Sequence, residues 1–270
     1  MKLKNRRIML IFIVILFTTS IFILSNLNIL LGHYNDSNTY EYQINLPSNP
    51  YMLHEYLNPI NNKRIFNPGQ NPPNTNWTCP AGKVIKFGAF GNKSSPIKIA
   101  YIIGVHPAEE ESHKAIYNSI LKNQNNLKYC YYIYKVEVNA SNDYNKNRYY
   151  GQLLAYKYAV SDIAKNKFVM VVDVHSNQGK YEEKTFIFTA IPNNESLLVA
   201  HFLVKNLPGL SYYIPPRSNE PTSAPYISEP LIKNGTPIIV YETYRYEAFN
   251  LTEKKAQDFI MVLDNFNFYN

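Results

Sequence analysis

From residue 84 onward, apolar runs of strand length alternate with segments whose apolar residues recur at helical spacing. Short apolar runs rich in β-branched and aromatic residues, bounded by turn-forming residues, predict strands. Such runs occupy residues 84–91, 97–104, 129–138, 168–175, 185–191 and 236–243. Apolar residues that recur at helical spacing, as Ala115, Ile116, Ile120 and Leu121 do, predict helices. The predicted helices cover residues 110–123, 149–166, 194–207 and 251–266, the last capped by Thr252.

Strands that alternate with helices predict an α/β domain. We therefore expect a central mixed, mostly parallel sheet flanked by helices. In open sheets of this kind, ligands bind beyond the carboxyl ends of the strands. Polar residues that directly follow a predicted strand are therefore the first candidates for a functional site.

The first 33 residues show a different pattern. Four basic residues precede a stretch, residues 8–32, that contains no charged side chain. About 20 apolar residues suffice to cross a bilayer as a helix, and positive charge before the span favours a cytoplasmic N-terminus. We expect residues 1–33 to be an uncleaved signal anchor in the cell membrane, with a single span and the C-terminal domain outside the cytoplasm. Secretion after signal cleavage is the alternative, although the sequence around residue 25 matches a cleavage site poorly.

Between the predicted anchor and the predicted α/β domain (residues 83–270) lies a segment without sustained periodicity. Residues 34–82 are rich in Asn, Pro, Ser and Tyr, a composition typical of loops and turns. We interpret this segment as an irregular stalk and lead-in.

Charge and cysteine content narrow the partners. The chain has a net charge of +7, and four of these charges belong to the basic residues before the predicted span. The remaining excess, about three charges, gives no reason to expect nucleic acid as a partner. The two cysteines, Cys79 and Cys130, could form one disulfide outside the cell, but two free thiols are equally compatible with the sequence.

Ionisable residues stand at the ends of three predicted strands. His106 and Glu109 follow the strand at 97–104, His175 ends the strand at 168–175, and Glu242 lies near the end of the strand at 236–243. Two histidines and one carboxylate suit a catalytic zinc site, which keeps one position open for water. Glu242 is then the carboxylate available to take the proton from that water.

The order of these motifs resembles the zinc carboxypeptidase family, in particular its succinylglutamate desuccinylase and aspartoacylase branch. The resemblance rests on H-x-x-E after a strand, then N-R at Asn147 and Arg148, then D-x-H, then a late strand-terminal Glu, and it covers roughly residues 84 to 265. It implies that His106, Glu109 and His175 bind one Zn²⁺ and that Glu242 is the general base. It also implies that Asn147 and Arg148, on a loop, hold a carboxylate of the substrate, with arginine as a two-pronged donor.

One feature departs from the family pattern, which includes a further arginine before N-R that stabilises the oxyanion. No arginine lies between Glu109 and Arg148. Arg148 could serve both roles, Lys146 could substitute, or Arg217 or Arg245 could reach the site from a later loop. Because oxyanion stabilisation is typically worth about 3 kcal/mol, the departure weakens the case for activity more than that for zinc binding.

Residues near the motifs add further expectations. Asp173 is two residues from His175 on the same face of the strand, so it could support that histidine. We expect His113 to lie on the surface of its helix. Four tyrosines lie near the candidate residues in the sequence and could contact substrate: Tyr212, Tyr213, Tyr241 and Tyr244.

These observations favour an extracytoplasmic zinc hydrolase that cleaves an amide or peptide bond next to a substrate carboxylate. Its partners would be a peptide or acyl-amino-acid substrate with a free carboxylate, and the membrane through the N-terminal helix. Two alternatives stay open: a cell-surface binding module that keeps the fold without catalysis, and an N-acyl amino acid deacylase. The absent arginine favours the binding module, whereas Glu242 opposes it, because a binder has no use for a base.

Overall fold

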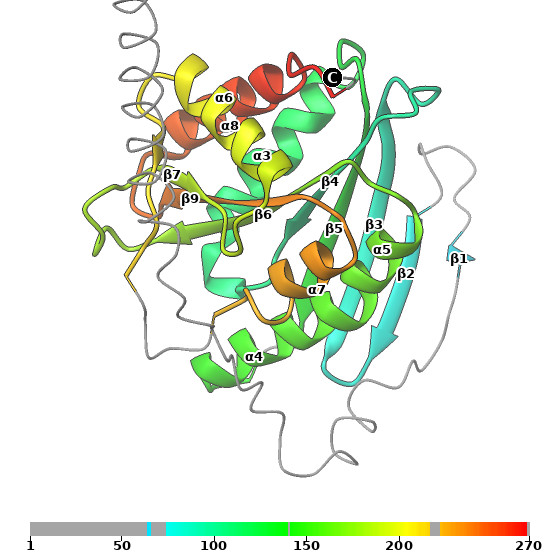
Figure 1. Ribbon diagram of the computed structural model, residues 1–270. Helices are drawn as coiled ribbons and strands as arrows, with labels where there is room; N and C mark the ends of the chain where they lie inside the picture. The colour runs from blue at the N-terminus through cyan, green and yellow to red at the C-terminus, as the bar shows by residue number, and fades with distance from the viewer. Residues whose placement is uncertain (1–63, 66–73, 140, 217–221, 269–270) are drawn as a thin grey trace, which may run out of the picture. The chain divides into compact units, whose positions relative to one another are not determined.

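One sheet runs through the part of the chain that the computed structural model describes, residues 64–65, 74–139, 141–216 and 222–268. It contains nine strands in the order β1-β2-β3-β5-β4-β6-β9-β7-β8 (Figure 1). Their bounds are β1 Arg64–Ile65, β2 Asn74–Cys79, β3 Gly82–Gly91, β4 Lys98–Ile103, β5 Cys130–Val138, β6 Met170–Asn177, β7 Phe186–Phe188, β8 Ser211–Tyr212 and β9 Ile238–Tyr244.

The direction of the strands differs between the centre and the edges of the sheet. The central strands β5, β4, β6 and β9 are parallel to one another, and so are β7 and β8. The other four pairs, β1–β2, β2–β3, β3–β5 and β7–β9, are antiparallel. The prediction of a mixed sheet is confirmed. The expectation that the sheet is mostly parallel holds only for its centre, because four of the eight strand pairs are antiparallel and lie outside that centre.

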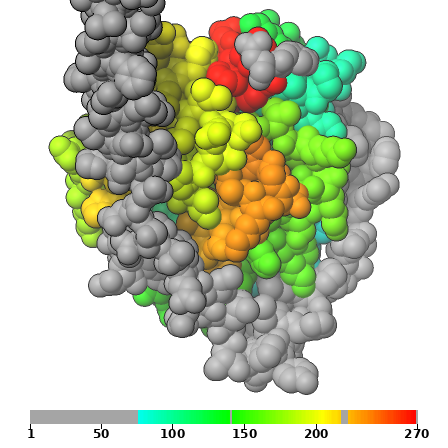
Figure 2. Space-filling model, viewed as in Figure 1, coloured from blue at the N-terminus to red at the C-terminus, as the bar shows by residue number. Residues whose placement is uncertain are grey.

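Helices cover both faces of the sheet (Figure 1). On one face lie α3 (Glu110–Asn123), α6 (Asn194–Asn206) and α8 (Phe249–Leu263), and on the other lie α4 (Tyr144–Leu154), α5 (Ser161–Lys165) and α7 (Ser228–Lys233). A π-helical segment, Ala155–Val160, joins α4 to α5. In the space-filling view, α6 lies in the yellow area of the surface and α7 in the orange area (Figure 2).

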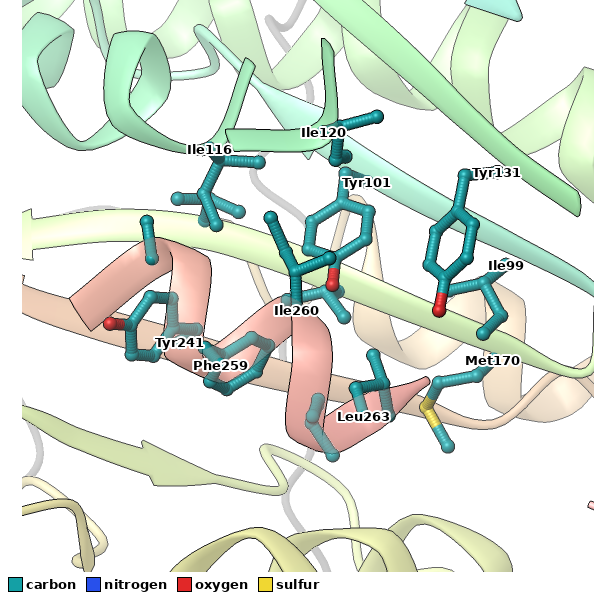
Figure 3. Close-up of a cluster of buried hydrophobic side chains, with 14 of the residues drawn as sticks. Ile99, Tyr101, Ile116, Ile120, Tyr131, Met170, Tyr241, Phe259, Ile260 and Leu263 are labelled. Atoms are coloured by element: carbon teal, nitrogen blue, oxygen red, sulfur yellow. The ribbon is translucent and has the colours of Figure 1, made fainter. Parts of the chain in front are cut away.

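Apolar side chains from α3 and α8 meet the sheet in the core shown in Figure 3. Ile116 and Ile120 of α3 lie in one cluster with Phe259 of α8 and Tyr101 of β4, all nearly without exposure. The other face of β4 packs against the second helical layer through Ala100 and Ile102. Burial on both faces explains why β4 reads as an uninterrupted apolar run.

Several element boundaries differ from the sequence prediction. The predicted helix at 149–166 begins earlier, at Tyr144, because Asp143 accepts a hydrogen bond from the backbone N–H of Lys146 and caps it. The closing helix begins at Phe249, and Thr252 is inside it, donating to Glu247 instead of capping. The short helix α7 was not predicted, and β2 forms within the segment that was predicted to be irregular.

The predictions for the N-terminal segments fall mostly outside the residues that the structure describes. The predicted anchor, residues 1–33, lies outside the described part of the chain, as does most of the predicted stalk. Within the described residues, no helix combines the length and apolar character needed to cross a membrane. Cys79 and Cys130 are both buried and form no disulfide in this structure, so of the two alternatives the free thiols are found.

Candidate metal centre

A tight turn at the end of β4 brings His106 and Glu109 together. Gly104 has φ of +83°, and a Cβ there would lie 2.1 Å from the carbonyl oxygen of Val136, so both the conformation and the space require glycine. His106 follows, and a single turn of 3₁₀-helix, Pro107–Glu109, places the carboxylate three residues later beside its ring. Glu109 therefore enters the site at the start of α3.

The structure brings the three predicted metal ligands into one buried group. Nδ1 of His106 lies 3.0 Å from Oε1 of Glu109, and Nδ1 of His175 lies 2.9 Å from Oε2 of the same carboxylate. The ligand atoms of the three residues all lie within 4.8 Å of one another. Each side chain is at most 7% exposed. Segments 66 residues apart in the sequence thus supply one cluster.

The far nitrogen of each histidine has its own partner. Nε2 of His175 lies 3.0 Å from Oδ2 of Asp173, as the same-face placement of these residues predicts. The hydroxyl of Ser223 lies 3.1 Å from the same Asp173 oxygen and 3.2 Å from Nε2 of His175. Nε2 of His106 lies 3.2 Å from the side-chain amide of Gln152, on α4. Ser223 and Gln152 were missed by the sequence analysis.

A sequence signal for one of these two residues did exist. Gln152 is four residues after Arg148, and residues at this spacing share a helix face. The prediction of a loop around Asn147 and Arg148 concealed that relationship. Ser223 belongs to no motif, and only the folded chain brings it to the site.

Two buried carboxylates, of Glu109 and Asp173, flank the ring of His175 and favour its protonated form. Burial alone would lower the pKa of His175, but Asp173 and Glu109 together raise it well above its usual value. Burial would raise the pKa of Glu109, yet the two histidines hold it well below its usual range. Burial lowers the pKa of His106 to about 4, so this ring is neutral. The positive charge of the group therefore resides on His175, between two carboxylates.

Glu242 lies beside His175 on the neighbouring strand. The two residues are partners in the parallel register of β6 and β9, so their side chains emerge next to each other on one face. Burial raises the pKa of Glu242 to about 8, whereas the charge of His175 opposes this increase. Its Oε2 is buried without a hydrogen-bond partner among the described residues.

The donor set fits a zinc ion. Two imidazole nitrogens and one carboxylate oxygen are the ligands of catalytic zinc sites, and here both Nδ1 atoms face the same carboxylate. A cation at this place would replace the proton of His175 while Asp173 keeps the hydrogen bond to its other nitrogen, an arrangement that orients ligands in metal sites. Near the cluster, Oγ of Ser176 and Oδ1 of Asp173 are also buried without a hydrogen-bond partner among the described residues. Such orphaned polar atoms are compatible with a polar occupant.

The predicted substrate-binding residues have different surroundings. Both Asn147 and Arg148 lie on α4 and not on a loop. Nη1 of Arg148 is 3.2 Å from Oε1 of Glu109, so its side chain reaches the cluster. The amide of Asn147 instead accepts from the backbone N–H and hydroxyl of Ser141 and donates to its carbonyl. Contact of Asn147 with a substrate stays a prediction.

The candidates for the missing arginine are only partly located. Arg217 lies outside the described residues. The ammonium group of Lys146 lies 5.5 Å from the ring centre of Tyr150, on its own helix. The backbone N–H of Arg245 donates to the carbonyl of Asn177, which brings the chain of Arg245 next to the end of β6.

Packing corrects the expectation for His113, whereas substrate contact of Tyr212, Tyr213 and Tyr244 stays a prediction. His113 is only 6% exposed, and its Nε2 lies 3.1 Å from the carbonyl oxygen of Val174, so it does not lie on the helix surface. Tyr241 stacks on Phe259 with ring centres 4.2 Å apart and belongs to the core. Tyr212 shares a hydrogen bond with Thr189, and Lys184 lies over the ring of Tyr244.

Comparisons with known proteins give matches only at the level of structure. No family model matches the sequence, and no curated protein matches it either. The structure is similar to the tripeptide-bound cell shape determinant Csd4 of Helicobacter pylori, with a TM-score of 0.46, 13% identity, and coverage of 68% of this chain and 54% of that one.

Two further matches are a metallo-carboxypeptidase from Burkholderia cenocepacia and a succinylglutamate desuccinylase/aspartoacylase from Rhodobacter sphaeroides. The first has a TM-score of 0.43 and 13% identity, and the match covers 67% of this chain and 59% of that one. The second has a TM-score of 0.47 and 11% identity, with 74% and 67% covered. The chain thus spans little more than half the length of the first two structures.

Proposed function

We propose that the chain is a zinc-dependent hydrolase that cleaves an amide bond next to a substrate carboxylate. We further propose that it acts outside the cytoplasm, held at the membrane by residues 1–33 or secreted after their removal. The observation that carries the proposal is the convergence of both Nδ1 atoms, of His106 and His175, on the two carboxylate oxygens of Glu109. Each histidine faces the carboxylate through Nδ1 while a polar partner contacts its Nε2, which is the arrangement expected of metal-binding imidazoles.

His106, Glu109 and His175 would hold the metal. When bound, zinc polarises the carbonyl of the substrate and makes a water molecule more acidic. Glu242 accepts the proton of the attacking water at its unpartnered Oε2 and returns it to the leaving amine. Because burial raises the pKa of Glu242 to about 8, the carboxyl holds a proton readily, and a nearby cation favours its ionised form before attack.

Arg148 supports the choice of a substrate with a free carboxylate. Its guanidinium is mostly buried, with a side chain 15% exposed, and Nε has no hydrogen-bond partner among the described residues. One terminal nitrogen contacts Glu109, which leaves donors for an anion that enters the site. Peptide C-termini and N-acyl amino acids both present such a carboxylate, so a deacylase is the nearest alternative activity.

The binding-module alternative has one specific observation in its favour. No arginine lies between Glu109 and Arg148 in the sequence, and Lys146 lies over Tyr150. If no other cation reaches the carbonyl oxygen, the site would bind a carboxylate and a metal without turning substrate over efficiently.

The test is hydrolysis of a peptide library by the purified chain, with added zinc or with chelator. Each peptide is supplied with a free and with an amidated C-terminus, and N-acyl amino acids form a second panel. We expect zinc-dependent release of an amine from free-carboxylate compounds only, and its loss in Glu242→Gln. Zinc binding without any turnover would favour the binding module, and cleavage of amidated peptides at equal rate would contradict the role of Arg148.

A further inference from the structure

The two histidines of the metal centre are supported by different chemical groups. His175 has the carboxylate of Asp173 at Nε2, 3.0 Å away, whereas His106 has the neutral amide of Gln152, 3.2 Å away. We infer that Gln152 is the positioning residue for His106 and that its amide serves both the metal-free and the metal-bound form of this ring. The inference rests on the proposed zinc site but concerns a residue outside the ligand set.

The backbone of α4 holds Gln152 firmly in place. The side chain is fully buried, and the preceding residue, Gly151, lies so close to the turn after β4 that a Cβ there would be 1.8 Å from the carbonyl oxygen of Val105. Val105 directly precedes His106. The amide and the imidazole are therefore positioned by one backbone contact, which leaves little freedom to change their separation.

The metal-free ring needs a donor at Nε2. Nδ1 of His106 lies 3.0 Å from a carboxylate oxygen of Glu109, which can only accept, and Nε2 lies 3.2 Å from the amide nitrogen of Gln152, which can only donate. The single ring hydrogen is therefore on Nδ1. Nε2 then carries a lone pair, and the amide nitrogen of Gln152 donates to it.

The metal-bound ring needs the opposite partner. With Nδ1 occupied by a cation, the ring hydrogen must be on Nε2, where it requires an acceptor. A half-turn of the amide places the oxygen of Gln152 at that position. A side-chain amide offers both a donor and an acceptor, whereas a carboxylate would suit only the metal-bound form and an apolar side chain neither.

The charge of the neighbourhood gives a reason for an amide here. Glu109, Asp173 and Glu242 already place three carboxyl groups in and around the site. A fourth carboxylate would add like-charge repulsion in a buried environment, which is costly in the metal-free protein. Glutamine supplies the hydrogen bond without the charge.

Zinc affinity of the full chain, measured by competition with a chromophoric chelator, tests the inference. We expect Gln152→Leu to bind zinc about 10- to 100-fold more weakly, the usual effect of removing a partner of a metal-bound histidine. Gln152→Glu keeps an acceptor at the same distance, so we expect affinity equal to or above that of the unaltered chain. Asn123→Leu is the matched control, because Asn123 is another buried helical amide but bonds only to Ser119 of its own helix; its affinity should stay within about threefold.

A second readout separates positioning from a general effect on folding. In the zinc-loaded chain, the Nε2–H of His106 should give a slowly exchanging proton resonance that remains in Gln152→Glu and is lost in Gln152→Leu. Equal affinity of Gln152→Leu and the unaltered chain would overturn the inference, as would equal losses in Gln152→Leu and Gln152→Glu. If the unaltered chain itself binds no zinc, the proposed function fails, a result that the variants cannot mimic. If Gln152→Leu does not fold, Gln152→Glu decides on affinity and resonance together.

Discussion

Nη1 of Arg148 lies 3.2 Å from Oε1 of Glu109, so the guanidinium proposed to hold the substrate contacts a proposed metal ligand. The same carboxylate receives Nδ1 of both histidines and the backbone N–H of Ser176. Glu109 thus links the proposed metal site, the proposed substrate-binding arginine and the strand that carries His175. Events at the metal and at the substrate carboxylate are expected to be coupled through this one side chain.

Replacing Arg148 with alanine should separate these two functions. We expect kcat/KM for free-carboxylate substrates to fall about 10- to 150-fold, the equivalent of losing a hydrogen bond to a charged group. Zinc affinity should stay the same or rise, because a positive charge next to Glu109 is removed. Steady-state kinetics and chelator competition measure the two quantities. Arg148→Lys keeps the charge but loses the fork, so it should recover only part of the activity; a loss of zinc affinity in Arg148→Ala would contradict the coupling.

Glu242→Gln should abolish turnover and leave zinc in place. General-base catalysis contributes about 10²- to 10⁴-fold, so kcat should fall by that range, and Glu242 is not among the clustered ligand atoms. Single-turnover assays of the zinc-loaded chain measure the loss. Retained activity with normal zinc content would show that another group takes the proton.

His113 should make the metal-free protein sensitive to acid. Burial lowers the pKa of His113 to about 4, below the ordinary value of 6.5 that the unfolded chain retains. Between these pH values the unfolded state binds more protons than the folded state. The contribution of neutral, buried His113 to stability is therefore present above pH 6.5 and is lost as pH falls toward 4. The loss amounts to about 3 kcal/mol as an order of magnitude.

Urea unfolding in the presence of chelator, from pH 4.5 to 7.5, measures this contribution. His113→Gln places an amide donor near the position of Nε2, toward the carbonyl of Val174, but does not titrate. The variant should show a shallower decline of the free energy of unfolding with acid. Parallel curves for both proteins would exclude His113 as a source of the sensitivity.

Of the two groups near Nε2 of His175, the charged Asp173 should contribute more to zinc affinity than the neutral Ser223. Asp173→Asn removes the carboxylate 3.0 Å from Nε2, and we expect zinc affinity to fall about 10-fold or more. Ser223→Ala removes a neutral hydroxyl 3.2 Å from the same nitrogen, so its effect should be smaller. Isothermal titration with zinc gives both values. The reverse order would mean that Ser223, and not Asp173, orients the ring.

Gly151→Ala should disturb both stability and the metal centre. The added Cβ would lie 1.8 Å from the carbonyl oxygen of Val105, so α4 must move away from the residue that precedes His106. Overpacking of this kind costs about 1–3 kcal/mol, and zinc affinity should fall because α4 carries Gln152, the partner of His106. Asn145→Ala, on the exposed start of α4, is the control and should change stability by less than about 0.5 kcal/mol. An unchanged zinc affinity in a destabilised Gly151→Ala would show that α4 does not position the site.

The strands and the polar residues at their ends were predictable because each depends on local chemistry. An apolar run such as β4 must be buried on both faces, and a parallel arrangement brings the ends of such strands to one edge. His106, Glu109, His175 and Glu242 could therefore be expected near one another from their positions alone, and the first three do form one cluster. The sequence by itself thus determined the layered α/β architecture and the residues of the candidate metal cluster.

Only the tertiary structure decided which nitrogen of each histidine faces Glu109 and which groups support the rings. Gln152 and Ser223 reach the site from 46 and 48 residues away from the histidines they contact, through the approach of α4 and of the segment before α7. The buried position of His113, four residues after Glu109, likewise depends on the carbonyl of Val174 across the fold. The periodicity of the sequence does not predict these contacts. They join residues far apart in the chain, and their geometry depends on how the helices pack on the sheet.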